Sequence, residues 1–493
     1  MPSACFERKI RKKREGPTGK VTETGTKSTG ALLIAILSVL LASCRSSPTG
    51  PKVTGNVQLS AGYVACTEVW LKIAFSAQQS ATSGGTYKIT RDSTTVLTGS
   101  FSGTDTTVID TTTQPNRTYT YQAYKLANGK VIELGIPIQV TTPDTTSSDY
   151  TWELFRLGEW QTGYPSKFND IAIVNDTTII AVGQIYVNDS TTLDGYPPYN
   201  MATWNGRSWQ LRRLEFPLYD SNGTQVGSGP FPANGVYSFS RDDIWLCSGG
   251  SMVHLTNGIP QPVCISSGYG NRDLEELYGV NGFVYVTGTN GFVGYYDGFV
   301  WKQVFTGTDL GLYDACSNDG QTVYIAGGDP ISDEGILLKG NAGGFQTMKE
   351  GRFVADQSQL FKPYFDGVIS TVWVSGSNSV YFGGAYLYRY RLGQYGLVRS
   401  LPGNNPYGNS SIQYRGYISR IRGNADNDMV IVGNGNTVRH FNGGTWQQLG
   451  MPYAANSPYI WTSAAMKGNT IVVAGFTTAN PQWVATVIIF KRN

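Results

Sequence analysis

The sequence predicts an all-β protein in which a small β-sandwich precedes a seven-bladed β-propeller. The main observation is a short unit that recurs seven times from about residue 168 to the end of the chain. Each copy has two short apolar strands ending at a glycine, then another strand, a turn and an aromatic residue. The glycines are Gly183, Gly249, Gly288, Gly327, Gly383, Gly433 and Gly475. Repeats of this period that contain strands and no helix are typical of a β-propeller.

Composition supports the same fold class. The 493 residues include 60 glycines, and 40% of them are hydrophobic, which suits a turn-rich β protein large enough for two or three domains. Only 15% are charged, against roughly 25% in an ordinary soluble domain. Eight of the 38 Lys and Arg residues and three of the 35 Asp and Glu residues lie within residues 1–29. The remainder of the chain, from residue 30 onward, is nearly neutral. We therefore expect no nucleic-acid partner.

The N-terminal region predicts a cellular address. Residues 31–43 read ALLIAILSVLLAS and are followed by Cys44. This apolar run is too short to span a bilayer, but it has the length of a signal-peptide core. Residues 41–44 resemble the lipobox of bacterial lipoproteins. The resemblance implies that Cys44 is acylated, that residues 1–44 are a signal peptide, and that residues 45–51 form a tether.

The residue after the cysteine, Arg45, gives no inner-membrane retention signal of the Asp type. We therefore expect a lipid-anchored protein of the bacterial cell envelope, in the outer membrane or at the cell surface. The alternative is a single-pass signal anchor that carries a cysteine by chance.

Residues 52–144 are dense in Thr and Ser, and short alternating strands recur at a spacing typical of a small β-sandwich. The expected strands are Val69–Phe75, Tyr87–Arg91, Thr106–Asp110, Thr118–Tyr124 and Ile136–Thr141. Residues 142–150 are expected to form a short polar linker.

This segment resembles a fibronectin type III domain. The resemblance is carried by Trp70 in an early strand, GGTYKITR at residues 84–91 and PNRTYTYQAY at residues 115–124. It implies that the hydroxyl group of Tyr119 or Tyr121 ties down a corner of the sandwich. It also implies the role of a spacer or adhesion module, without catalysis.

Tight turns define the strands of each propeller blade. Asn-Gly and Asp-Gly pairs suit two-residue hairpins because both central positions need a positive φ. They occur at Asn205-Gly206, Asn257-Gly258, Asn281-Gly282, Asp297-Gly298 and Asn442-Gly443. The recurring aromatic, as Trp209, Trp301, Phe345 and Trp446, is expected to pack between blades.

The seventh copy ends without an outer strand. TWELFRL at residues 151–157 matches the outer-strand sequences SWQLRRL at 208–214, VWKQV at 300–304 and TWQQL at 445–449. We therefore predict that residues 151–157 supply the missing strand and that the propeller spans residues 151–493. Such closure removes exposed sheet edges.

The repeats resemble secreted bacterial propellers of the kelch-like and Asp-box-like kind. Residues 442–446, Asn-Gly-Gly-Thr-Trp, come nearest to an Asp-box but lack its Ser and Asp. The resemblance implies an architecture and no catalytic residues.

The insertions indicate where a ligand would bind. Residues 184–200 and 328–335 fall between strands two and three of a blade, and residues 215–234, 349–367, 401–417 and 450–459 fall between blades, so all belong to one face. Long loops on a rigid scaffold commonly carry binding residues, and Tyr and Phe give a large contact area. The predicted ligand-binding residues are Tyr186, Tyr196, Tyr199, Phe231, Tyr364, Phe365, Tyr407, Tyr414 and Tyr417. The alternative is that these aromatics only pack the loops onto the propeller.

Little in the sequence points to catalysis. His254 and His440 occupy the same place in two copies, which favours packing over a Ser-His-Asp arrangement or a metal site. We expect no cofactor. Carboxylates at Asp189, Asp194, Glu275, Glu276, Asp329, Asp333 and Glu334 are interpreted as solvated loop acids. The prediction is non-catalytic recognition or scaffolding, with a glycan or an envelope protein as ligand. The alternative is a carbohydrate-active hydrolase or lyase that uses loop carboxylates.

Overall fold

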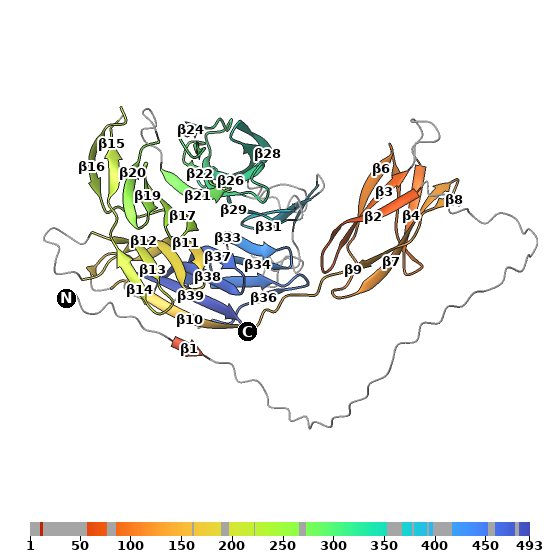
Figure 1. Cartoon of the computed structure of the whole chain (residues 1–493), viewed down its shortest axis with the longest axis horizontal. Coiled ribbons are helices and arrows are strands. Elements are labelled where there is room, and N and C mark those ends of the chain that lie inside the picture. Colours follow the sequence, from red (N-terminus) through yellow and green to blue (C-terminus); the bar gives the residue numbers. More distant parts are fainter. Residues whose placement is uncertain are drawn as a thin grey trace, which may run out of the picture. The chain divides into compact units, whose positions relative to one another are not determined.

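The computed structural model contains only β-strands as regular secondary structure within its described part, which confirms the all-β prediction. The described residues are 10–12, 57–75, 85–159, 162–188, 197–220, 222–265, 273–352, 367–376, 379–391, 394–397, 417–451, 459–478 and 483–493. They form two compact units. One consists of residues 13–143, and the other of residues 1–12 together with 144–493 (Figure 1). In these described ranges, no helix has the length and apolar character needed to cross a membrane.

The first unit has two antiparallel sheets. One has the strand order β2-β3-β6, and the other has the order β5-β4-β7-β8 with β9 also paired to β7. Their bounds are β2 Val57–Val64, β3 Val69–Phe75, β4 Gly85–Arg91, β5 Thr94–Phe101, β6 Asp105–Asp110, β7 Thr118–Ala127, β8 Lys130–Leu134 and β9 Ile138–Thr141. Alternating side chains of both sheets, such as Leu71 and Ile89, pack into one buried core, as expected of a sandwich.

Two tyrosines of β7 fix the corner of this unit. The Tyr119 hydroxyl accepts a hydrogen bond from the Gln114 backbone N–H at 2.9 Å. The buried Tyr121 hydroxyl donates to Asp110 at 2.9 Å, and Arg91 pairs with the same carboxylate at 2.7 Å. Of the two candidates, Tyr119 therefore binds the backbone upstream, while Tyr121 belongs to a buried ion-pair network.

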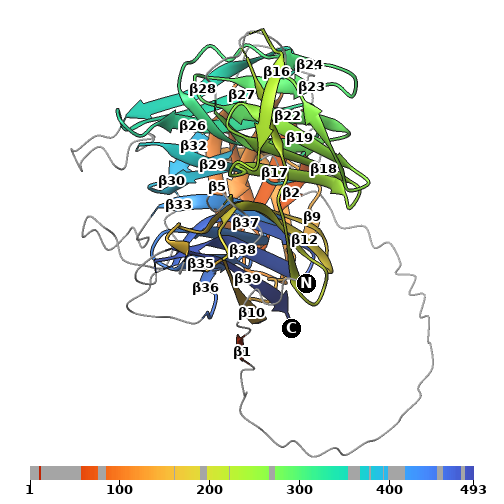
Figure 2. The ribbon, with the colours of Figure 1, turned by 90° about the vertical axis from the view of Figure 1, so that its left-hand side faces the viewer.

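The second unit is built from consecutive four-stranded antiparallel sheets (Figures 1 and 2). In six of the described sheets, all four strands are consecutive in the chain. A separate two-stranded hairpin lies between the first and the second of these sheets. The six sheets are β11 Lys167–Asn175, β12 Thr178–Ile185, β13 Tyr199–Trp204 and β14 Trp209–Arg212; β17 Gly235–Ser240, β18 Asp243–Ser248, β19 Ser251–Thr256 and β20 Ile259–Val263; β21 Leu274–Val280, β22 Phe283–Gly288, β23 Val293–Tyr296 and β24 Trp301–Gln303; β25 Gly311–Cys316, β26 Val323–Asp329, β27 Glu334–Asn341 and β28 Gly344–Arg352; β29 Ile369–Val374, β30 Val380–Gly384, β31 Leu387–Arg391 and β32 Gln394–Leu397; β33 Ile418–Ala425, β34 Asp428–Gly433, β35 Thr437–Phe441 and β36 Trp446–Gln448.

The last sheet joins both ends of the unit. It contains β37 Tyr459–Lys467, β38 Thr470–Thr477, β39 Val484–Arg492 and then β10 Tyr150–Leu157, with the short strand β1 Ile10–Lys12 beyond it. β10 pairs with β39 without a register shift, from Tyr150 opposite Arg492 to Leu157 opposite Ala485. Residues 151–157 thus lie where the repeat pattern placed them, beside the last strand of the chain.

The first strands of the sheets lie against one another in chain order. Each contacts the first strand of the next sheet, and β37 contacts both β33 and β11. We call the line that they surround the axis of the unit. Apolar side chains fill the space between neighbouring sheets. Between the last and first sheets, the ring of Phe155 in β10 packs against the ring of Trp204 in β13, with centroids 4.9 Å apart.

Glycines allow a bulge to recur in the first strands. Six of these described strands have a register shift after the residue that faces a glycine on the second strand, and the six pairs are Phe168–Gly183, Leu274–Gly288, Leu312–Gly327, Ile369–Gly384, Ile418–Gly433 and Trp461–Gly475. A Cβ atom on any of these glycines would lie 1.8 to 2.5 Å from a carbonyl oxygen at the start of the first strand. Only glycine permits this close approach.

Two of the predicted repeat glycines are not equivalent to the others. In the fifth sheet, the glycine opposite the bulge is Gly384 and not Gly383, because Ile369 pairs with Gly384. In the second sheet, Gly249 lies in the turn between β18 and β19 with φ +48°, and Cys247 takes the place opposite Gly235. The second sheet has no register shift at that point.

The connections agree with the predicted turns in part. Both residues of Asn257-Gly258 and Asn281-Gly282 have positive φ angles, as a two-residue type I′ hairpin requires. At Asn205-Gly206, Asp297-Gly298 and Asn442-Gly443 only the glycine has a positive φ. The insertion at residues 215–234 contains its own hairpin, β15 Phe216–Tyr219 and β16 Gln225–Gly229, which the sequence analysis did not predict. The aromatics Trp209, Phe345 and Trp446 are buried, which agrees with packing between sheets.

Candidate functional site

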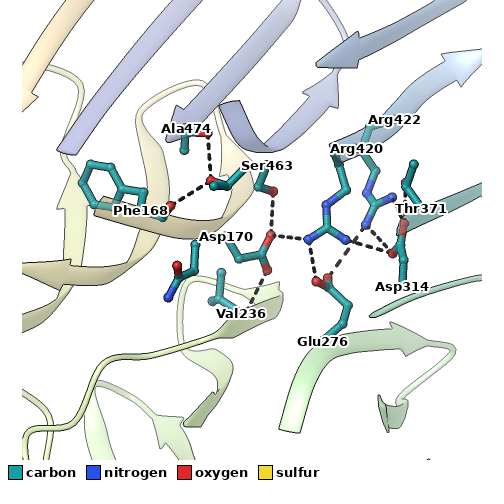
Figure 3. Close-up of polar contacts among 12 residues, drawn as sticks. Phe168, Asp170, Val236, Glu276, Asp314, Thr371, Arg420, Arg422, Ser463 and Ala474 are labelled. Atoms are coloured by element: carbon teal, nitrogen blue, oxygen red, sulfur yellow. Dashed lines mark hydrogen bonds and ion pairs between the residues drawn. The ribbon is translucent and has the colours of Figure 1, made fainter. Parts of the chain in front are cut away.

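A cluster of charged side chains fills the axis of the second unit (Figure 3). It consists of Asp170, Glu276, Asp314, Arg420 and Arg422, and we call it the axial cluster. The three acids come from β11, β21 and β25, and both arginines come from β33. Asp170, Glu276, Asp314 and Arg420 are buried. Asp170, Glu276, Asp314 and Arg420 each follow a first-strand bulge, so the bulge is what places them at the axis.

The two guanidinium groups contact the three carboxylates at different distances. Arg420 lies 2.6 Å from Glu276, 3.4 Å from Asp170 and 3.0 Å from Asp314. Arg422 donates two hydrogen bonds to Asp314, at 3.0 and 2.9 Å, and lies 3.8 Å from Glu276. The paired bonds to Asp314 have the fork geometry that suits an arginine and a carboxylate.

The remaining first strands complete the cluster with neutral donors. Thr371 of β29 donates to Asp314 at 2.6 Å, and Ser463 of β37 donates to Asp170 at 2.6 Å. The second sheet contributes its backbone, because the Val236 N–H of β17 donates to Asp170 at 2.9 Å. Each of the seven first strands in the described part of the chain therefore supplies a polar group to one buried network.

Burial and charge set the protonation of the cluster. Burial raises the pKa of Glu276 well above its ordinary value; Arg420 opposes this shift, and Asp170 and Asp314 reinforce it. Burial would also raise the pKa of Asp314, but Arg422 and Arg420 lower it below its ordinary value. Three carboxyl groups share two guanidinium groups, and burial with the neighbouring acids favours the protonated form more at Glu276 than at Asp314.

The carboxylates of the axial cluster are engaged by its own arginines. Its carboxylates are buried and already paired, so they offer no free pair of acids to a substrate. The interpretation of Glu276 as a solvated loop acid is wrong, because Glu276 lies within β21 and is buried. Among the described residues, no three His, Cys, Asp or Glu side chains are placed to hold a metal ion. The cluster instead fills the axis and ties the sheets together.

A second feature is a group of aromatic side chains where the first and last sheets meet. We call Tyr164, Tyr186, Phe476 and Trp483 the aromatic shelf. The rings of Tyr164 and Tyr186 stack with centroids 5.1 Å apart, and those of Phe476 and Trp483 stack at 4.4 Å. Tyr164 is 46% exposed and Trp483 is 41% exposed, so the shelf presents aromatic surface to solvent.

Backbone hydrogen bonds hold the shelf in place through Ser166, which is buried. The Ser166 N–H donates to the Trp483 carbonyl at 3.0 Å, and its Oγ accepts from the Tyr186 N–H at 3.0 Å. The Glu159 N–H donates to the Tyr186 carbonyl at 2.7 Å. The three segments lie between β10 and β11, after β12 and before β39, which are all connections of the predicted binding face.

The predicted ligand-binding residues have different positions. Tyr186 belongs to the shelf. Tyr199 begins β13 and lies under the Arg213 guanidinium group at 3.9 Å, Phe231 follows β16 and is 38% exposed, and Tyr417 precedes β33 and is half-buried. The others lie outside the described residues; they are Tyr196, Tyr364, Phe365, Tyr407 and Tyr414.

Two of the predicted loop acids lie opposite each other across a turn. Asp329 and Glu334 are backbone register partners at the ends of β26 and β27. The Asp329 carboxylate accepts the Ile331 N–H of its own turn at 2.8 Å, which lowers the pKa of Asp329. Asp189 and Asp194 lie outside the described residues.

The two histidines have equivalent acid partners but different surroundings. His254 Nε2 lies 2.7 Å from Asp243, and His440 Nε2 lies 2.8 Å from Asp428. Ser148 Oγ lies 2.7 Å from His440 Nδ1, so a Ser-His-Asp series exists that the sequence argument did not support. The serine comes from the linker and not from either of the two repeat copies that carry the histidines.

This series is not arranged as a reactive centre. The His440 side chain is fully buried, and Asp428 also pairs with Arg492 and accepts from Asn424 at 2.7 Å. The series instead attaches the linker to the second unit.

The sequence analysis missed both the axial cluster and most of the shelf. A signal exists for four of the five axial residues. Asp170, Glu276, Asp314 and Arg420 each stand two positions after the apolar residue that precedes the bulge. For the shelf, Tyr164 and Trp483 lie in short connections, whereas the predicted binding residues lie in the long insertions.

Comparison with known proteins shows likeness in fold only. No family model matches the chain, and no curated protein matches it. Among similar solved structures, "YCF48 bound to D1 peptide" is 12% identical, covers 69% of this chain and 95% of its own, and has a TM-score of 0.45. The WD40 β-propeller domain of Doa1 is 14% identical, covers 69% and 95%, and has a TM-score of 0.46. YCF48 from Cyanidioschyzon merolae is 12% identical, covers 57% and 98%, and has a TM-score of 0.32.

Proposed function

We propose that the second unit is a seven-bladed β-propeller closed by β10, and that the first unit is a fibronectin type III-like sandwich. The contacts of each first strand with the next, including β37 with β11, support the propeller. The division of strands β2-β3-β6 and β5-β4-β7-β8 and the backbone hydrogen bond of Tyr119 support the sandwich.

We further propose that this protein is a lipid-anchored component of a bacterial cell envelope, attached through Cys44 in the outer membrane or at the cell surface. The support is the apolar run at residues 31–43 and the lipobox-like residues 41–44, which lie outside the described residues. Metabolic labelling with an alkyne fatty acid, comparing the parent with Cys44→Ala, tests this. Equal labelling of both proteins would contradict the anchor.

The proposed activity is non-catalytic recognition or scaffolding, with a glycan or an envelope protein as ligand. The aromatic shelf carries this proposal, because each of its two stacked pairs leaves one ring exposed, Tyr164 and Trp483, while hydrogen bonds fix the backbone beside them. Rigid aromatic groups supply contact area at low entropic cost. The filled axis adds support, since a ligand cannot enter where Arg420 and its acids already lie. A hydrolase or lyase would need accessible paired carboxylates, and the carboxylates of the axial cluster are buried and engaged by arginines.

The test is binding to a glycan array and to an envelope fraction by the full-length protein. Tyr164→Ala combined with Trp483→Ala should weaken the binding at least about tenfold, as expected for aromatic residues that dominate an interface. The matched control is Phe299→Ala, because Phe299 is 88% exposed but lies in the turn between β23 and β24, on the opposite set of loops. Full binding by the double variant would show that the shelf is not the ligand site.

A further inference from the structure

The linker between the two units is attached to the sixth sheet of the second unit. The Thr146 N–H donates to the Asn442 carbonyl at 3.0 Å, and its Oγ1 donates to the Asn427 carbonyl at 2.6 Å. The Asn427 side-chain amide donates to the Asp144 carbonyl at 3.3 Å. Asn427 and Asn442 lie in the turns after β33 and after β35, so two hairpins hold the same short segment.

Beyond these contacts, the linker meets the end of the chain. Ser148 contacts His440, which contacts Asp428, and Arg492 of β39 pairs with the same Asp428 carboxylate. Arg492 also donates to the Tyr150 hydroxyl at 2.6 and 3.0 Å. Tyr150 and Arg492 are the terminal register pair of β10 and β39. The network therefore lies at the end of β10 that is next to the linker.

We propose that residues 144–149, Asp428, His440 and Arg492 form a latch that controls the release of β10 from the last sheet. This inference rests on the proposed role of β10 as the closing strand and goes beyond it. Without the latch, a displacement at Tyr150 would separate β10 from β39 one register pair at a time. With the latch, the same displacement must first break contacts to the sixth sheet, so β10 opens together with the linker and not by fraying.

Electrostatics strengthen the centre of the latch. Burial alone would raise the pKa of Asp428, but hydrogen bonds from His440, Asn424 and Arg492 and the charge of Arg492 lower it below its ordinary value. The ring of Tyr150 lies 5.5 Å from the ring of His440 in an edge-on arrangement. The latch therefore joins residues of β10, β34, β35 and β39 in one partly buried network.

The second sheet contains a natural control. Asp243 and His254 occupy the same strand positions as Asp428 and His440, with a similar distance between them. No linker covers them in the described part: the His254 side chain is 23% exposed and Asp243 is 42% exposed, whereas His440 is fully buried. Substituting either pair removes the same local hydrogen bond, but only one pair belongs to the latch.

Hydrogen exchange of the full-length protein tests the proposal by following the backbone amides of residues 151–157. Asp428→Asn and the milder Ser148→Ala should each accelerate exchange in β10, by about tenfold or more for Asp428→Asn, which weakens a hydrogen-bonded charged group. Asp243→Asn should leave the exchange of β10 unchanged. Ser148→Ala removes one hydroxyl group and keeps the test valid if Asp428→Asn does not fold.

Two results would overturn the latch. One is unchanged exchange of β10 in Ser148→Ala and Asp428→Asn. The other is equal acceleration by Asp243→Asn, which would mean a general loss of stability. Failure of the closing strand itself gives a different result, since residues 151–157 would then lack protection in the unaltered protein as well.

Discussion

Replacing Arg420 with methionine removes the cation that the three acids of the axial cluster share. Arg420 lies 2.6 Å from Glu276, 3.0 Å from Asp314 and 3.4 Å from Asp170. Asp314 keeps both hydrogen bonds from Arg422, and Asp170 keeps those from Ser463 and the Val236 N–H. The loss therefore falls mainly on Glu276. Removing one partner of a buried ion pair costs about 3–5 kcal/mol, and the retained contacts favour the lower end, about 3 kcal/mol.

The pH dependence of this loss identifies its cause. The pKa of Glu276 is already raised in the folded protein, and without Arg420 it rises further. A carboxyl group whose folded pKa is raised binds its proton more tightly when folded, so it favours folding at low pH. That contribution is complete below the unfolded pKa of about 4.3 and is lost as the pH rises through the folded value. The destabilisation should therefore be smaller at pH 5 than at pH 8.

Urea unfolding followed by tryptophan fluorescence at the two pH values measures the effect. Adding Glu276→Gln to Arg420→Met should recover at least about 1 kcal/mol, because neighbouring sites in one ion-pair network are coupled. Arg207→Met is the matched control, since Arg207 is exposed and surface changes usually stay within about 0.5 kcal/mol. Equal stability of Arg420→Met and the parent at pH 8, or a loss independent of pH, would refute this account of the axial cluster.

Three further predictions concern the ring and its closure. Deleting residues 151–157 should lower the melting temperature of the second unit substantially, and an unchanged melting curve would show that β10 does not close it. Gly433→Ala places a Cβ 1.8 Å from the Tyr417 carbonyl oxygen and should destabilise the unit in urea, whereas Gly450→Ala, with no atom within 4 Å, should not. Burial would raise the pKa of Asp428, but hydrogen bonds from His440, Asn424 and Arg492 lower it below its ordinary value. The ionised Asp428 therefore stabilises the folded protein fully above about pH 4, and this stabilisation is lost as the pH falls. Protection of β10 against exchange should decline over that acid range, and a decline of equal size in Asp428→Asn would contradict the assignment.

The sequence predicted those parts of the fold that depend on local patterns. Asn-Gly pairs mark hairpins because few other residues accept two positive φ angles in succession. Residues 151–157 could be assigned to the last sheet because they share the aromatic and alternating pattern of the other outer strands, as at residues 208–214. The pairing of Tyr150–Leu157 with β39 agrees with that assignment.

The candidate site was harder to predict because its residues differ in type from copy to copy. At the six equivalent bulge positions, the sheets carry Asp170, Glu276, Asp314, Thr371, Arg420 and Ser463, and a search for repeated residues does not align these. The charges balance only in the assembled unit, because the Arg420 guanidinium group contacts acids from three other sheets. Such pairing depends on the ring and not on any single repeat.

The second sheet shows how the glycines and the axial cluster depend on each other. Six sheets have a glycine opposite the first strand, a bulge beside it and a side chain that reaches the axis. In the second sheet Cys247 takes the place of that glycine, and β17 continues in register through Gly235 and Val236. Val236 then supplies only its N–H to Asp170. The glycine therefore does more than end a strand: it makes room for the bulged backbone, and the bulge directs the next polar side chain to the axis. The repeat that defines the scaffold is also what assembles its charged centre.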